Sequence, residues 1–161
     1  MERLYAGLSF EQAVDKYIQT VYSVCVMRLS GNSDVDDCVQ NTFIKLYEKS
    51  PDFNDENHLK AWLLRVAVNE CRMSIRRSLR LIPLDTLKDM PLPRSEDSGD
   101  LSRALMKLGG KYREVLYLHY EEGYKVREIA EILNTKEGTV SSLLKRGRDK
   151  LKKHMEVMTD E

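Results

Sequence analysis

The 161-residue chain has few cysteines, histidines and prolines. Its three cysteines, Cys25, Cys38 and Cys71, are scattered in apolar helical patterns, which excludes a disulfide framework and favours small buried side chains. Its three histidines have no ligand-like spacing, and CxxC and HExxH are missing, so we expect no metal site. GxGxxG, GxxxxGKS/T and GxSxG motifs are missing as well. An enzyme therefore has little support, and we expect no cofactor.

Long apolar runs are also missing. No segment approaches the roughly 18 uninterrupted apolar residues of a membrane span. The first residues lack a basic start followed by an apolar core, so no secretion signal is predicted. We expect a cytoplasmic protein without direct membrane insertion. The hydrophobic fraction of 42% suffices for a packed core.

The formal net charge is zero, because 26 Lys and Arg residues balance 26 Asp and Glu residues. The charges are unevenly distributed, however. Residues 60–80 and 136–154 are strongly basic, whereas residues 34–37 and 96–100 are acidic. Two basic stripes predict two contacts with a polyanion. Solvated helix faces are the alternative interpretation, and charge alone does not decide between them.

Apolar residues recur at intervals of three and four, which predicts an all-α protein. Ser9 and Gln12 form a predicted capping box before the first helix. Ile18 and Tyr47 are assigned to the apolar faces of the first two helices, and Trp62 to that of the third. The predicted helices span residues 10–29, 34–49, 59–79, 101–108, 111–122, 126–133 and 136–155.

The sequence changes character between the third and fourth predicted helices. Pro83, Pro91 and Pro93 fall here among serines, a glycine and acids. Such a composition resists helix and core formation and predicts a flexible linker. A loop of this length inside one compact domain would be unusual. We therefore predict a domain over residues 1–80, a linker over 81–100 and a second domain over 101–161.

Residues 126–146 follow a helix-turn-helix pattern. Ala130 is small where two helices must approach closely, and Val140 and Leu144 fall on a shared apolar face. Hydroxyl and basic side chains fall on the open face and suit base edges and phosphates of a major groove. A plain helical hairpin is the alternative. The turn, the small residue and the basic end of the segment together favour DNA binding.

Three collinear segments carry a resemblance to a known family. Residues 34–47 and 60–72 resemble the second conserved region of bacterial sigma factors, and residues 137–148 resemble the recognition helix of their fourth region. The chain is most similar to the short extracytoplasmic-function (ECF) sigma factors. The resemblance implies an all-α fold, with a three-helix region 2 domain and a region 4 helix-turn-helix domain joined by a flexible linker.

The resemblance implies a dissociable specificity subunit of bacterial RNA polymerase. In the family, an acid-rich helix of region 2 docks on the clamp of the largest polymerase subunit. Relatives often have glutamate at the position of Asn41. The core-binding residues carried over to this chain are Asp36, Asp37, Gln40 and Asn41.

The same resemblance implies two DNA contacts. Phe53 offers a stacking face for a flipped base of the minus-ten element, with core packing as its alternative role. The implied minus-ten residues are Phe53, Lys60, Asn69, Arg72, Arg76 and Arg77. The implied minus-thirty-five residues are Arg127, Thr139, Ser141, Ser142, Lys145, Arg146 and Arg148. Tyr112 and Arg113 are expected to support the DNA backbone. Many relatives have basic residues at the positions of Ser141 and Leu143, so the DNA sequence recognised is not transferable.

The implied partners are core RNA polymerase, through its clamp and flap region, promoter DNA and an anti-sigma factor that could hold the chain at the membrane. A stand-alone dimeric helix-turn-helix regulator, an enzyme with a DNA-binding tail and a non-transcribing decoy for an anti-sigma factor remain as alternatives. The acidic and basic patches also suggest, as a hypothesis, a compact and self-occluded free state.

Overall fold

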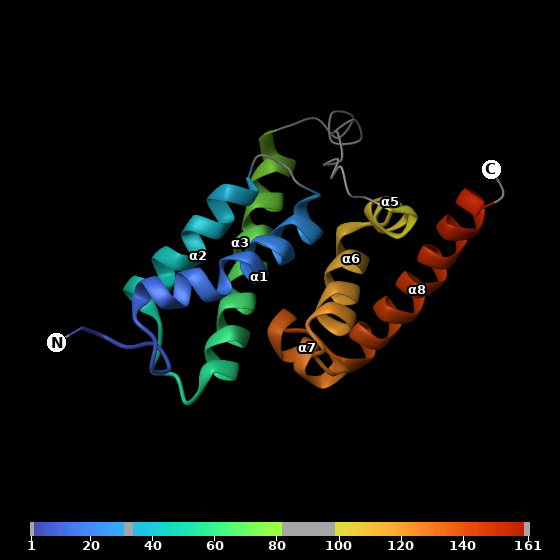
Figure 1. Cartoon of the computed structure of the whole chain (residues 1–161). Coiled ribbons are helices and arrows are strands. Elements are labelled where there is room, and N and C mark those ends of the chain that lie inside the picture. Colours follow the sequence, from blue (N-terminus) through green and yellow to red (C-terminus); the bar gives the residue numbers. More distant parts are fainter. Residues whose placement is uncertain (1, 31–33, 82–98, 160–161) are drawn as a thin grey trace.

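The computed structural model describes residues 2–30, 34–81 and 99–159. Within these ranges every regular element is a helix, which confirms the all-α prediction (Figure 1). The first domain contains α1 (Phe10–Leu29), α2 (Val35–Lys49) and α3 (Glu56–Leu81). The second contains α5 (Asp100–Met106), α6 (Gly110–Leu116), η1 (Tyr117–Glu121), α7 (Val126–Leu133) and α8 (Glu137–Thr159). Most of the predicted linker lies outside the described residues.

The first helix begins and ends through local hydrogen bonds. The Gln12 backbone N–H donates to Ser9 Oγ at 3.1 Å, and the Ser9 backbone N–H donates to Gln12 Oε1 at 2.9 Å. The predicted capping box is confirmed. At the other end, Ser30 adopts a left-handed backbone with φ 58°, and its N–H donates to the Val26 carbonyl at 2.7 Å. This reversal ends α1.

Long aliphatic side chains fill the core of the first domain. Leu46, Leu59, Leu63 and Leu64 are at most 1% exposed. Trp62 is half-buried and packs against this core, as predicted. Dense packing of this kind makes each of these positions sensitive to the loss of a few methyl groups.

Ile18 and Tyr47, assigned to the apolar faces of their helices, are not buried, because Ile18 is 38% exposed and Tyr47 is 65% exposed. Val39, Phe43 and Leu46 supply the buried stripe of α2. Tyr47 follows Leu46 and lies at the outer edge of that stripe. Its ring contacts the Phe10 ring edge-on, with the ring centres 5.3 Å apart. The apolar face of α2 is therefore wider here than the part that neighbouring helices cover.

The three cysteines come together in the first domain, although they are scattered in the sequence. Cys25, Cys38 and Cys71 are all free and buried. The contact with Cys71 and burial raise the pKa of the Cys38 thiol, and the contact with Cys25 together with burial raises that of Cys71. Such thiols remain protonated and behave as small core side chains, as predicted.

The second domain is organised around α6 and α8. Val140 and Leu144 are buried on α8, and Gly147 lies so close to α6 that an added Cβ would be 3.3 Å from Leu116 Cδ1. Asn134 follows the last residue of α7, and its backbone is left-handed with φ 53°. This left-handed residue turns the chain from α7 into α8 and completes the predicted helix-turn-helix.

Several helix boundaries differ from the prediction; α8, for example, ends at Thr159 rather than at residue 155. α3 begins at Glu56 rather than at residue 59, because Asp55 Oδ1 accepts the His58 backbone N–H at 2.8 Å. The predicted helix over 111–122 is divided into α6 and the π-helical turn η1. There the Glu122 N–H donates to the Tyr117 carbonyl, five residues earlier, at 3.1 Å.

The two domains pack against each other. α1 contacts α6 and η1, and α3 contacts α7. Buried side chains of both domains belong to one continuous apolar cluster. Figure 1 shows the second domain beside α1 and α3, on the side away from α2.

Candidate functional site

One face of α2 presents the predicted core-binding residues. Asp36, Asp37 and Gln40 are exposed and lie on adjacent turns. The two aspartates are in the first turn of the helix, where they also complement the positive end of the helix dipole. This face is therefore accessible to a partner, and its two aspartates also stabilise the helix.

Asn41 faces inward and has a different role from these three residues. It is half-buried, and its Nδ2 donates to Glu70 Oε2 on α3 at 3.4 Å. The side chain of Glu70 is only 4% exposed, and its other oxygen lies 2.5 Å from Lys45 Nζ. The amide therefore helps Lys45 to satisfy a buried carboxylate, which explains an asparagine here.

We expect Asn41→Glu to destabilise the first domain by about 1–2 kcal/mol, since it places a second carboxylate beside Glu70 and one unit of pKa perturbation corresponds to about 1.4 kcal/mol. Thermal unfolding at pH 8 measures this loss. Gln40→Glu, the same change at the exposed neighbour, is the control. Equal melting temperatures for the two variants would contradict this account.

An apolar groove of about 580 Å³ adjoins the acidic face. Gln40 lies at its edge, and Ile44 and Tyr47 follow on the same side of α2 with 49% and 65% exposure. Helical spacing placed these residues on apolar faces of α1 and α2, but it does not show that neighbouring helices leave part of those faces uncovered. The full lining is Phe10, Val14, Ile18, Val39, Gln40, Phe43, Ile44, Tyr47 and Glu48.

Aromatic side chains gather where the loop before α3 meets the helix. Phe53 is half-buried, and its ring contacts two others edge-on. The ring centres are 5.1 Å apart for His58 and 5.6 Å apart for Trp62. Phe53 thus partly packs against the core, its alternative role, and partly remains accessible. The Asn54 backbone N–H donates to His58 Nδ1 at 3.1 Å, which fixes the loop against the helix.

The predicted minus-ten residues of α3 are not equivalent in the structure. Asn69, Arg76 and Arg77 are exposed. Lys60 and Arg72 are half-buried and contact the second domain. Lys60 Nζ lies 2.5 Å from Glu122 Oε2, and Arg72 Nη2 donates to the Leu133 carbonyl at 2.7 Å. Arg65 is a further exposed base on this helix that the prediction omitted.

The open face of the helix-turn-helix is accessible, as a DNA-reading surface requires. Thr139, Ser142 and Lys145 are exposed on α8, whereas Val140 and Leu144 face inward. Arg148 donates to Tyr120 Oη at 3.1 Å, which ties α8 to η1. The exposed members of the predicted minus-thirty-five set are Arg127, Thr139, Ser141, Ser142, Lys145, Arg146 and Arg148.

Arg113 cannot support the DNA backbone, because its side chain is buried between the domains. It is 3% exposed, and its Nε donates to the Met27 carbonyl at 2.6 Å. It also bonds to Ser30 Oγ and to the Leu108 carbonyl. Burial lowers the pKa of Arg113 to about 10, so the guanidinium remains charged at neutral pH.

Glu114, the next residue, is the other buried ionic group at this junction. Its Oε2 lies 3.0 Å from Arg28 Nε on α1, and its side chain is 4% exposed. Burial raises the pKa of Glu114 despite the opposing charges of Arg28, Arg72 and Lys111. No periodic signal in the sequence could have located this contact between residues far apart in the chain.

The described part of the chain contains no group of three or more His, Cys, Asp or Glu side chains that could hold a metal ion. None of its helices is long and apolar enough to cross a membrane. The site thus consists of three helix faces: an acidic and apolar face on α2, a basic face on α3 and a polar, basic face on α8.

Two family models match separate parts of the chain. Residues 13–80 match the family model "Sigma-70 region 2", and residues 98–151 match "Sigma-70, region 4". The chain is 30% identical to the ECF RNA polymerase sigma factor SigW of Bacillus subtilis, over 91% of this chain and 89% of that protein. It is 26% identical to the ECF sigma factor SigM of Mycobacterium tuberculosis, over 89% and 75% of the two chains.

Solved structures show the same fold. The sigma factor RpoE in complex with the anti-sigma factor NepR from Bartonella quintana superposes with a TM-score of 0.73, at 24% identity, over 92% of this chain and 97% of that chain. CnrH in complex with the cytosolic domain of CnrY gives a TM-score of 0.63 at 27% identity, over 92% and 88% of the chains. The class defined by fold and site is that of two-domain sigma factors. Within that class, the chain belongs to the ECF RNA polymerase sigma factor family.

Proposed function

We propose that this protein is an alternative sigma factor that binds core RNA polymerase and directs promoter-specific transcription initiation. One observation carries the proposal: a single chain exposes a helix-turn-helix, a separate basic helix and an acidic docking face on two domains that match sigma-70 regions 4 and 2. The chain acts by binding and positioning DNA, and we propose no covalent catalysis.

The minus-ten element is recognised by the first domain, residues 1–80. Exposed Asn69 offers an amide to a base edge, and Arg76 and Arg77 follow phosphates. The accessible part of Phe53 provides a stacking surface for an unpaired base. Lys60 and Arg72 are assigned to the same DNA contact, although both bind the second domain in this structure.

The minus-thirty-five element is recognised by the second domain, residues 101–161. Thr139, Ser142 and Lys145 project from the open face of α8 toward a major groove. The segment 81–100 links the domains. Core polymerase would hold both domains at a fixed separation, which raises the effective concentration of the second DNA contact.

Polymerase docks on the face of α2. Asp36 and Asp37 supply negative charge that attracts the partner and fixes its orientation. The neighbouring groove at Ile44 and Tyr47 supplies apolar surface that the partner can bury. The partner is the clamp of the largest subunit, and the flap region receives the second domain. Asn41 helps to hold Glu70 beneath this face and does not form part of the exposed surface.

An anti-sigma factor is a further proposed partner, because the similar sigma factor RpoE was solved in complex with the anti-sigma factor NepR. A chain that works with RNA polymerase belongs in the cytoplasm. A membrane-bound regulator would hold it at the membrane without insertion of the chain itself.

Charge reversal on α2 tests the polymerase contact. We expect Asp37→Arg to weaken binding of the full chain to core polymerase at least tenfold, or about 1.4 kcal/mol, since it places a cation on the docking face. Fluorescence-detected titration of labelled chain with purified core measures the affinity. Glu2→Arg, the same reversal at an exposed residue before α1, is the control. Equal affinity of both variants and the parent chain would contradict the proposed docking face.

A further inference from the structure

A pocket of about 310 Å³ lies between the two domains, and its charged lining is mainly cationic. Its walls come from α1 and α3 of the first domain and from α6, α7 and α8 of the second, so neither domain forms the pocket alone. The charged residues of the lining are Arg28, Arg72, Arg76, Lys111 and Glu114. Four cations thus face a single carboxylate, a balance that favours binding of an anion.

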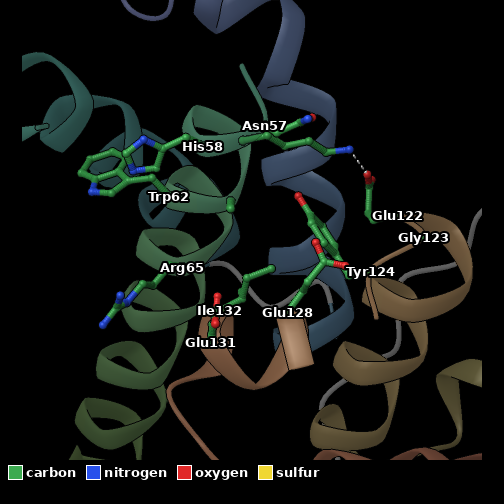
Figure 2. A pocket seen from close by; sticks show the side chains of 12 residues that line it. Asn57, His58, Trp62, Arg65, Glu122, Gly123, Tyr124, Glu128, Glu131 and Ile132 are labelled. Atoms are coloured by element: carbon green, nitrogen blue, oxygen red, sulfur yellow. Dashed lines mark ion pairs between the residues drawn. The ribbon is translucent and has the colours of Figure 1, made fainter. Parts of the chain in front are cut away.

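A larger pocket between the domains, of about 450 Å³, has a different charge balance (Figure 2). Three carboxylates line it beside two bases of α3, and these residues are Glu122, Glu128, Glu131, Lys60 and Arg65. Lys60 Nζ already pairs with Glu122 Oε2 at 2.5 Å, the ion pair drawn as a dashed line in Figure 2. Of these two pockets, the smaller one is therefore the candidate anion site.

Three cations of the smaller pocket come from different helices and converge on its one carboxylate. Glu114 is buried, and burial raises its pKa. The charges of Arg28 on α1, Arg72 on α3 and Lys111 on α6 oppose that rise, because they lie near the carboxylate. Arg28 Nε lies 3.0 Å from Glu114 Oε2, and this ion pair balances the carboxylate. The other cations of the pocket are then in excess of its negative charge.

The excess cations keep most of their binding capacity. Arg76 and Lys111 are exposed, and neither side chain forms an ion pair or a hydrogen bond with the described residues. Arg72 Nη2 donates to the Leu133 carbonyl at 2.7 Å, a neutral group that leaves the guanidinium charge unbalanced. Like charges held close together repel one another, and an anion placed between them relieves the repulsion. The pocket therefore favours an anion with more than one negative charge.

The rest of the lining offers hydroxyl groups and apolar surface. Thr135 precedes α8, and Thr139 lies in its first turn, where the positive end of the helix dipole also favours an anion. Ile75, Leu133 and Leu143 supply the apolar part. Cations and hydroxyls suit a phosphate group, and the aliphatic side chains suit an organic group attached to it.

We propose that this pocket binds a small phosphorylated organic molecule of nucleotide size, whose phosphate or pyrophosphate group is held between the two domains by Arg72, Arg76 and Lys111. A terminal phosphate carries close to two negative charges at neutral pH, whereas each backbone phosphate of DNA carries one. The excess of cations therefore favours the small molecule over a DNA strand. The inference does not rest on the proposed sigma-factor function, because it concerns a different class of ligand.

Arg76→Ala combined with Lys111→Ala tests the proposal, and truncation of two exposed side chains should change the stability little. Calorimetric titration of the full chain with sodium pyrophosphate, at neutral pH and low ionic strength, measures the affinity for the phosphate group. Arg65→Ala combined with Lys107→Ala is the matched control. It removes one exposed base from α3 and one from the second domain, both outside this pocket.

We expect pyrophosphate to bind the parent chain with a Kd below about 1 mM. The Arg76 and Lys111 double variant should weaken binding at least about tenfold, and the control double variant by less than about twofold. Equal weakening in the two double variants would overturn the proposal, because it would show an effect of overall charge alone.

A second probe distinguishes a small phosphate from the phosphates of DNA. Anisotropy of a fluorescein-labelled single strand of about 20 nucleotides measures DNA binding by the same variants. Absence of pyrophosphate binding at about 5 mM would overturn the proposal. Loss of strand binding in the Arg76 and Lys111 double variant would then assign these cations to DNA.

Discussion

Removal of two basic side chains from the recognition helix should abolish most promoter-specific transcription. Lys145 and Arg146 are exposed on α8 beside Thr139 and Ser142. A good side-chain contact to a base edge contributes about 1–3 kcal/mol. We expect Lys145→Ala combined with Arg146→Ala to reduce run-off transcription by the holoenzyme at least about 30-fold, the equivalent of about 2 kcal/mol.

The matched control removes the same charge from the same domain elsewhere. Lys107 is exposed at the end of α5, and Lys150 Nζ lies over the Tyr112 ring at 5.2 Å. Lys107→Ala combined with Lys150→Ala should leave most of the transcription intact. A comparable loss in both double variants would mean that α8 contributes only its overall positive charge, and the assignment of the recognition face would be wrong.

The second large effect concerns stability. Leu64 on α3 is completely buried in the core of the first domain. Truncation of a buried leucine to alanine leaves a cavity and costs about 2–5 kcal/mol. For a chain of this length, each kcal/mol corresponds to about 2–4 °C in melting temperature. We therefore expect Leu64→Ala to lower the melting temperature by about 5–15 °C, measured by circular dichroism at 222 nm.

Leu101→Ala provides the comparison, since Leu101 is 58% exposed on α5. It should change the stability by less than about 0.5 kcal/mol. If both leucine variants melted together, α3 would not be the central helix of the first domain's core. The assignment of its opposite side to DNA would lose its structural basis.

Local signals predicted much of the fold. α1 spans the predicted residues, because the Ser9 and Gln12 box sets its start, and α7 does so too. The start of α3 was missed because the polar run before residue 59 looked like a loop, although Asp55 caps the helix there. The π-helical turn was missed since its hydrogen bonds, such as that from the Glu122 N–H to the Tyr117 carbonyl, have no sequence signature.

The site was predicted unevenly for a similar reason. The exposed faces of α2 and α8 follow from helical spacing and charge, which are local properties. Arg113 was predicted to contact the DNA backbone, because periodicity does not show what packs against a residue. In the structure α1 covers its side chain. Tyr47 was assigned to the apolar face of its helix but is exposed, since none of the described helices covers its side of α2. Contacts between the two domains depend on tertiary packing, which motif spacing does not contain.

The most direct test of the central claim is run-off transcription on fragmented genomic DNA from the source bacterium, with purified core polymerase in the presence and absence of the full chain. The account predicts discrete new start sites that share two upstream elements at a fixed spacing. It also predicts that these starts disappear with the Lys145→Ala and Arg146→Ala double variant. A folded chain that binds core polymerase but produces no new start would contradict the account.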